Sequence, residues 1–114
     1  RKDKVRSLIT RLKKTVIRKN MGWCDDSKSK NYNKLIYFPF KYSAEKLYRR
    51  ENIYDILLVL NFNMNPIRKN KGSAIFIHVA KKNFQPTQGC IALNKSELIK
   101  LVKSIKKNTA VKII

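Results

Sequence analysis

The clearest hydrophobic pattern lies in the second half of the chain, where two apolar runs flank a turn-rich segment. Residues 53–62 (IYDILLVLNF) are almost continuously apolar, as is typical of a strand covered on both faces. Residues 63–72 contain Asn, Pro and Gly, which favour turns, and residues 73–80 (SAIFIHVA) form another β-rich run. The pattern therefore predicts two strands joined by a loop.

The last part of the chain has the pattern of an amphipathic helix. Asn94 and Glu97 have the spacing of a capping box, and the apolar residues that follow mark one buried stripe while lysines occupy the other face. The stripe consists of Leu98, Ile99, Leu101, Val102 and Ile105. We expect a helix over residues 95–107, preceded by a short apolar segment at 89–93 and followed by a last strand over residues 110–114 (AVKII).

The beginning of the chain leaves its structure open. Residues 1–20 are strongly basic, and the spacing of their apolar side chains fits one face of a helix. A β-branched run at residues 15–17 fits a strand instead, and residues 1–15 also fit a poorly defined basic arm. The pattern does not decide among these three.

The segment that follows contains turn formers and short elements. Residues 21–33 lack periodicity and predict a long loop. Residues 35–38 are a short apolar stretch ended by a proline, and Ser43 as an N-cap predicts a short helix over residues 44–50.

Length and charge narrow the class of protein. A chain of 114 residues with 43% hydrophobic content predicts one domain with a core, and its longest apolar run is far below the roughly 20 residues of a spanning helix. The net charge of +20 fits either an anionic partner, such as a cell wall, a membrane or nucleic acid, or a solvated Lys-rich surface. Nucleic acid is the weakest of these, because no helix-turn-helix, zinc finger or RNA-recognition motif is recognisable.

Cysteine and histidine usage argues against a metal site. Cys24 and Cys90 could form one disulfide, but neither belongs to a CxxC pair, and His78 is the only histidine. A structural zinc site normally needs four such ligands, so we predict no metal and no cofactor. The chain begins with Arg1 and without a signal peptide, so we expect a processed or excised piece of a longer protein.

Cys90 has the local features of a nucleophile. A catalytic thiol needs a nearby base and main-chain donors for the oxyanion. Gly89 allows a sharp turn before Cys90, and His78 stands near the end of the preceding predicted strand. Taken alone, these residues fit either a catalytic pair or a packed thiol and a core histidine.

The wider segment changes that balance. Residues 73–93 (SAIFIHVAKKNFQPTQGCIAL) resemble the active-site signature of the L,D-transpeptidase catalytic domains (YkuD family), in which a histidine that ends a strand is followed by a Ser/Thr-x-Gly-Cys turn. The matching positions are His78, Thr87, Gln88, Gly89 and Cys90. Upstream, MGWCDD at 21–26, YN at 32–33 and IYD at 53–55 are similar to the branch with short spacing in the active site.

The resemblance implies a mainly β (α+β), sandwich-like catalytic domain in the bacterial cell envelope or periplasm that acts on peptidoglycan stem peptides. The Cys90 thiolate would attack the carbonyl of the third stem residue and expel the terminal D-alanine, with His78 as general base and a main-chain carbonyl near Val79 as its orienting group. An amine acceptor would give a cross-link and water a carboxypeptidase, while a binding module without turnover is a third reading. The sequence predicts neither the acceptor nor the oligomeric state.

The resemblance also implies a set of cleft residues and shows some departures. Gln88 and Ala92 stand where many members have His and Arg, and the opening strands of the family, with a Gly-rich segment and a Thr-Pro-x-Gly turn, are expected to be missing. Cys24, beside two carboxylates, is predicted to be a poor nucleophile. Besides Thr87 and Gln88, the cleft candidates are Trp23, Asp25, Asp26, Tyr54 and Asp55, for which roles in the core or in turns are the alternative.

Overall fold

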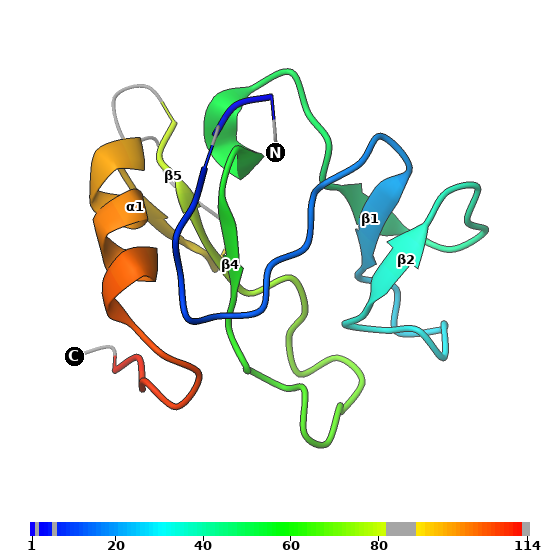
Figure 1. Cartoon of the computed structure of the whole chain (residues 1–114). Coiled ribbons are helices and arrows are strands. Elements are labelled where there is room, and N and C mark those ends of the chain that lie inside the picture. Colours follow the sequence, from blue (N-terminus) through cyan, green and yellow to red (C-terminus); the bar gives the residue numbers. More distant parts are fainter. Residues whose placement is uncertain (2, 6, 82–88, 113–114) are drawn as a thin grey trace.

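The computed structural model describes residues 1–112 except 2, 6 and 82–88, and this part of the chain contains two three-stranded sheets and one α-helix (Figure 1). The first sheet has the order β2-β1-β3, with both neighbours antiparallel to β1. The second has the order β4-β5-β6, in which β4 is antiparallel and β6 parallel to β5. The mainly β (α+β) prediction is therefore confirmed. The elements are β1 Met21–Cys24, β2 Leu35–Tyr37, β3 Ala44–Lys46, a 3₁₀ turn at Asn52–Tyr54, β4 Leu57–Val59, β5 Phe76–Val79, β6 Ile91–Leu93 and α1 Lys95–Ser104.

Strand β5 is the middle strand of the second sheet. Its four residues are all buried, whereas β4, the strand within the run at 53–62 that was predicted to be covered on both faces, is only partly buried. Ile77 and Val79 belong to a core cluster with Leu98 and Val102 of α1, and Figure 1 shows α1 lying against this sheet. Phe76 belongs instead to the cluster that contains Trp23 of β1, so the two sheets share one core.

The predicted helix near residues 95–107 is confirmed, although it ends at Ser104. The Asn94 side chain accepts a hydrogen bond from the Glu97 amide at 2.9 Å, which is the N-cap interaction expected from the sequence. Ala110–Lys112 lie outside any strand, so the predicted last strand is wrong for these residues, and residues 113–114 lie outside the described part.

The predicted short helix over residues 44–50 is wrong. Ala44–Lys46 forms strand β3, in which Ala44 pairs with Cys24 and Glu45 with Trp23. Ser43, the expected N-cap, donates its hydroxyl to Asp25 at 2.7 Å instead. Pairing with a distant strand has overridden the local helix signal.

Two other boundaries also differ. Residues 21–24 form β1 rather than the start of a long loop, and Gly22 permits the Phe38 ring to pass so close that an added Cβ would lie 2.7 Å from it. The predicted strand at 53–62 is reduced to β4, because residues 52–54 form a 3₁₀ turn before it.

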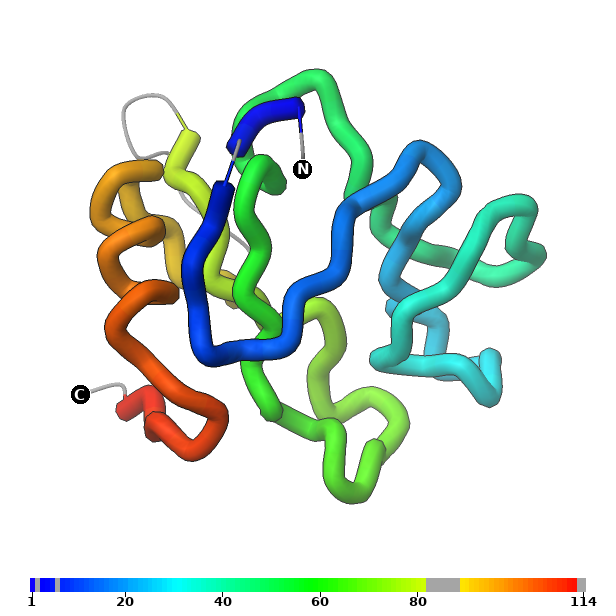
Figure 2. Tube along the Cα trace, in the orientation of Figure 1, coloured from blue at the N-terminus to red at the C-terminus, as the bar shows by residue number. Residues whose placement is uncertain are grey.

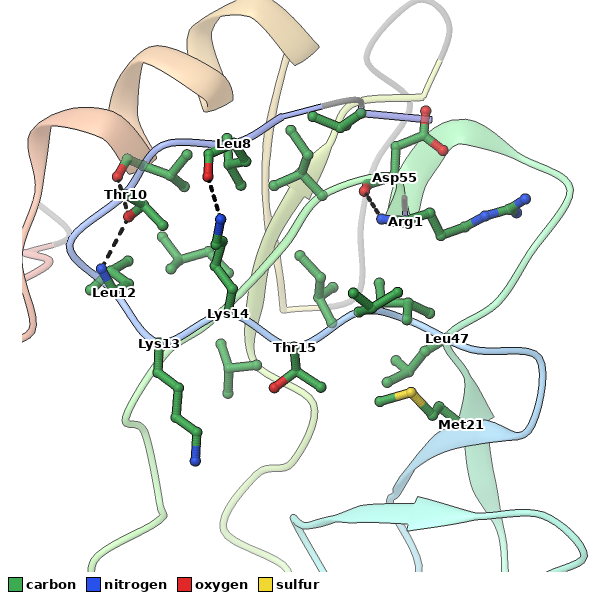
Figure 3. A pocket seen from close by; sticks show the side chains of 18 of the residues that line it. Arg1, Leu8, Thr10, Leu12, Lys13, Lys14, Thr15, Met21, Leu47 and Asp55 are labelled. Atoms are coloured by element: carbon green, nitrogen blue, oxygen red, sulfur yellow. Dashed lines mark hydrogen bonds between the residues drawn. The ribbon is translucent and has the colours of Figure 1, made fainter. Parts of the chain in front are cut away.

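The described residues of the segment 1–20 form neither helix nor strand, so both of those alternatives are wrong, while the reading of residues 1–15 as a basic arm stays a prediction. The segment crosses the body of the domain (Figure 2). Val5 and Leu8 pack against the helix-side core, and the Thr10 hydroxyl donates to the Val102 carbonyl at 2.6 Å. Between this segment and the sheets lies a pocket of about 1070 Å³, whose walls include Leu8, Leu47 and other aliphatic side chains (Figure 3).

Candidate active site

A smaller, polar pocket of about 530 Å³ contains both Cys90 and His78. The two sheets and the turn at Asn52–Tyr54 contribute to its wall, which consists of Asp25, Glu45, Arg49, Ile53, Tyr54, Ser73, Ala74, His78, Lys81 and Cys90. Neither Cys90 nor His78 lines the larger aliphatic pocket. We therefore place the candidate active site in the smaller pocket, where a thiol, an imidazole and charged groups meet.

Cys90 lies immediately before β6 and is half-buried. Gly89 has φ +81°, a conformation that side-chain-bearing residues rarely adopt, so the glycine is what allows the turn that presents the thiol. The Cys90 Sγ lies 3.2 Å from the Ala74 carbonyl oxygen. Burial raises the pKa of the Cys90 thiol above its ordinary value; a hydrogen bond with the Phe76 backbone lowers it, and the Glu45 carboxylate raises it. The raised pKa favours the thiol form of Cys90.

His78 is held in β5 with only 4% of its surface exposed. Its Nδ1 lies 2.8 Å from the Val79 carbonyl oxygen. Since a carbonyl can only accept, Nδ1 carries the proton in this contact, and in the neutral ring Nε2 is then the nitrogen able to take up a proton. The Tyr54 ring contacts the imidazole edge to face, with ring centroids 5.7 Å apart.

The parallel pairing of β5 and β6 explains why residues so far apart in sequence share one pocket. Ile77 pairs with Ile91 and His78 with Ala92. Cys90 therefore comes two positions before the partner of His78, on the neighbouring strand. Cys90 packs against the cluster that contains Phe76, and Phe76 shares a face of β5 with His78, two positions further on.

Glu45, Arg49, Ser73, Ala74 and Lys81 were not predicted from the sequence as site residues. Glu45 accepts a hydrogen bond from the Tyr54 hydroxyl and forms an ion pair with Arg49 at 3.1 Å. Burial and this bond to Glu45 raise the pKa of Tyr54 far above its ordinary value, so the phenol stays a donor. In the sequence, the only sign of the Glu45–Arg49 pair is their spacing of four residues. That spacing favours an ion pair on a helix and does not point to a pocket.

The sequence-predicted cleft residues divide into two groups. Tyr54 and Asp25 line the polar pocket, and Asp25 accepts the Ser43 hydroxyl hydrogen bond. Trp23 lines the larger pocket instead, and its indole donates to the buried Asn33 side chain at 2.9 Å. Thr87 and Gln88 lie outside the described residues.

The remaining candidates have other contacts. Asp26 accepts the backbone amides of Lys28 and Ser43, which hold the pKa of its carboxyl below the ordinary value. Asp55 is buried and pairs with Lys95 at 3.2 Å. Neither residue lines the polar pocket.

Cys24 differs from Cys90 in its environment. It is fully buried, and the two cysteines do not form the disulfide that the sequence left open. Within the described ranges, no group of three or more His, Cys, Asp or Glu side chains is placed to hold a metal ion. The same part of the chain has no helix long and apolar enough to cross a membrane.

Comparison with known families gives a match over almost the whole chain. The family model described as the L,D-transpeptidase catalytic domain (YkuD) matches residues 2–113. No curated protein and no solved structure matches in the corresponding comparisons. The chain therefore belongs to the YkuD family of L,D-transpeptidase catalytic domains.

Proposed function

We propose that this chain transfers acyl groups of peptidoglycan stem peptides through a thioester on Cys90, with His78 as the general base. The observation that carries the proposal is the polar pocket that contains both residues, with the imidazole anchored through Nδ1 by the Val79 carbonyl. That anchor fixes the tautomer and aims the basic nitrogen away from the strand backbone, as an orienting group does in other nucleophile–base pairs.

The acylation step follows from this arrangement. Nε2 of His78 removes the thiol proton as Sγ attacks the carbonyl of the third stem residue, and a tetrahedral intermediate forms. The backbone amides of Gly89 and Cys90 are the candidate donors to its oxyanion. The intermediate then expels the terminal D-alanine, whose amine takes the proton from His78, and leaves a thioester on Cys90.

The raised pKa of Cys90 is consistent with general-base catalysis. A thiol with a raised pKa needs a base during attack, because the thiolate is the nucleophile. His78 is the only histidine in the sequence, and it lines the same pocket as Cys90. It is therefore the residue that fits the role of the base.

The second half-reaction sets the final product. An amine that attacks the thioester gives a cross-link, and His78 takes the amine proton as the thiol is released. Water in the same position gives hydrolysis, so an L,D-carboxypeptidase is the alternative activity of the same site. A binding module without turnover is the third reading, and it would show no thioester.

The bacterial cell envelope is the proposed setting, and membership of the family supports it. A net charge of +20 supports this setting, since a strongly basic surface is attracted to anionic wall or membrane polymers. The fit of the pocket to a peptide rests on its mixed polar wall, which includes two carboxylates and two cations.

The direct test is mass spectrometry of the intact chain after incubation with a synthetic tetrapeptide stem. We expect a covalent adduct whose mass equals the stem without its terminal D-alanine, and an equal amount of released D-alanine. Cys90→Ala should remove the adduct completely, whereas the matched Cys24→Ala should retain it. An adduct lost equally in both variants, or no adduct in the parent, would contradict the proposal.

A further inference from the structure

A network of side chains on one wall of the polar pocket ends in an arginine that the proposed reaction has not yet used. Glu45 on β3 accepts hydrogen bonds from the Tyr54 hydroxyl and from Arg49. The Arg49 guanidinium also lies over the Tyr54 ring, 4.9 Å from its centroid. The ring of Tyr54 in turn contacts His78.

These contacts hold the guanidinium in one orientation. Nε donates to the Lys46 carbonyl at 2.9 Å, Nη2 donates to Glu45 at 3.1 Å, and the Tyr54 ring supports one face. The two bonds use two of the five N–H donors of an arginine. The Arg49 side chain is 30% exposed and lines the pocket, so its other donors are within reach of a ligand there.

We infer that Arg49 is a specificity-determining residue that binds the terminal carboxylate of the acyl donor, which is the carboxylate of the residue expelled from the stem. The inference rests on the proposed function. An arginine fixed by its neighbours suits this role, because its planar fork matches a carboxylate and little side-chain entropy remains to be lost on binding.

The position of Arg49 relative to His78 selects this carboxylate over others in the stem. In the proposed reaction His78 gives its proton to the leaving amine, so that nitrogen must lie beside the imidazole. The terminal carboxylate is attached to the same Cα as the leaving amine. A cation separated from His78 by a single aromatic ring is therefore placed for the leaving residue rather than for the distant end of the stem.

The charges of the pocket are compatible with an anionic ligand. The pocket wall contains two carboxylates, Asp25 and Glu45, and two cations, Arg49 and Lys81. Glu45 is already engaged by Tyr54 and Arg49, and Asp25 accepts the Ser43 hydroxyl. Lys81 is the rival cation, but it is exposed and carries a flexible point charge rather than a planar fork.

The test measures binding without turnover, in the Cys90→Ala background. Two tetrapeptide stems are compared by calorimetry, one with its terminal D-alanine carboxylate and one with the corresponding amide. With Arg49 present, we expect the acid to bind about tenfold to a hundredfold more tightly than the amide, the range of a charged hydrogen bond. Arg49→Gln should remove this preference while leaving amide binding almost unchanged, and Arg49→Lys should keep part of it.

The neighbouring Arg50→Gln is the matched control, since it removes the same charge from an exposed residue that does not line the pocket. It should keep the preference. Thermal unfolding of each variant, and its affinity for the amide stem, report whether the pocket is intact. If Arg49→Gln does not fold, the partial preference of Arg49→Lys still tests the inference.

Several results would overturn the inference: equal binding of acid and amide with Arg49 present, no measurable binding of either stem, or loss of the preference in Lys81→Gln but not in Arg49→Gln. The proposed reaction is judged separately, by thioester formation on the chain that retains Cys90. Carboxylate preference without a thioester would contradict the proposed reaction alone. A thioester formed equally well from both stems would contradict the role of Arg49 alone.

Discussion

The two faces of β5 differ: one packs into the apolar core, and the other carries the histidine of the proposed reaction. On one face, Ile77 and Val79 pack against Leu98 and Val102 of α1, and the contacts are purely apolar. On the other face, Phe76 packs between Trp23 and Tyr54, but His78 opens into the polar pocket. All these strand residues are buried, so burial alone does not separate a structural position from a chemical one.

The difference lies in how the polar atoms are satisfied. A buried imidazole is costly unless its polar atoms find partners. For His78, the Val79 carbonyl is the hydrogen-bond partner of Nδ1. In the proposed reaction, Nε2 is the nitrogen that contacts the reacting group in the pocket. On the helix-side face, the described residues Ile77 and Val79 present only apolar side chains to α1.

The largest expected effect comes from a substitution that disrupts packing on the helix-side face of β5. Leu98 is fully buried, so Leu98→Ala should lower the free energy of unfolding by about 2–5 kcal/mol, from lost transfer energy and a residual cavity. Urea denaturation measures this change. The matched control is Lys100→Ala on the exposed side of α1, which should change stability by less than about 0.5 kcal/mol. The comparison fails if Leu98→Ala proves as mild as the control.

The next effect concerns the pocket face. His78→Gln should leave the fold intact and slow acylation by at least about 100-fold, because the amide cannot take up the thiol proton. Single-turnover formation of the Cys90 thioester measures this rate. An unchanged rate would mean that His78 is only a core residue, and that both faces of β5 are structural.

These two faces also show what the sequence could predict. The β-rich run at 73–80 predicted the strand β5, and Asn94 with Glu97 predicted where the helix begins, but burial on both faces was predicted for residues 53–62, where β4 is only partly buried. The pairing of His78 with Cys90 came from resemblance to a family signature, since a lone histidine in an apolar strand has no local mark of catalysis. That catalytic role stays a prediction.

Glu45 and Arg49 could not be predicted as neighbours of His78, because their placement depends on pairing between distant segments. Locally, Ser43 and the residues after it favour a helix. The register of β3 on β1, together with the bond from Ser43 to Asp25, decides otherwise. Helix signals are local in sequence, whereas these contacts join residues about twenty positions apart or form only when the strand does.

A smaller effect is expected at Gln88, which stands where many relatives carry histidine. Gln88→Ala should slow acylation about five- to thirtyfold, the effect of one lost hydrogen bond of about 1–2 kcal/mol. The measurement is the same single-turnover assay. If this variant is as damaging as His78→Gln, the reaction does not depend on a single base.

The smallest effect sharpens the electrostatics of the pocket. Burial is the main cause of the raised pKa of Cys90, and the negative charge of Glu45 raises it too. Glu45→Gln removes that charge, so the pKa of Cys90 should fall and more thiolate should be present at a given pH. We expect alkylation by iodoacetamide at pH 8 to become about two- to fivefold faster.

The control for this variant is Glu51→Gln, which removes the same charge from an exposed residue outside the pocket. Its alkylation profile should follow that of the parent chain. If Glu45→Gln slows alkylation, or if both variants shift the profile equally, the proximity of Glu45 is not the cause.

The pairing of Cys90 with His78 is tested most directly by the pH dependence of single-turnover acylation in the parent chain and in His78→Gln. A general base acts only in its unprotonated form, so the parent rate should rise with pH as the base loses its proton. The rise should be absent in His78→Gln, whose rate increases only at higher pH as the buried thiol ionises, and Cys24→Ala should follow the parent. The same inflection in the parent and in His78→Gln would contradict the account.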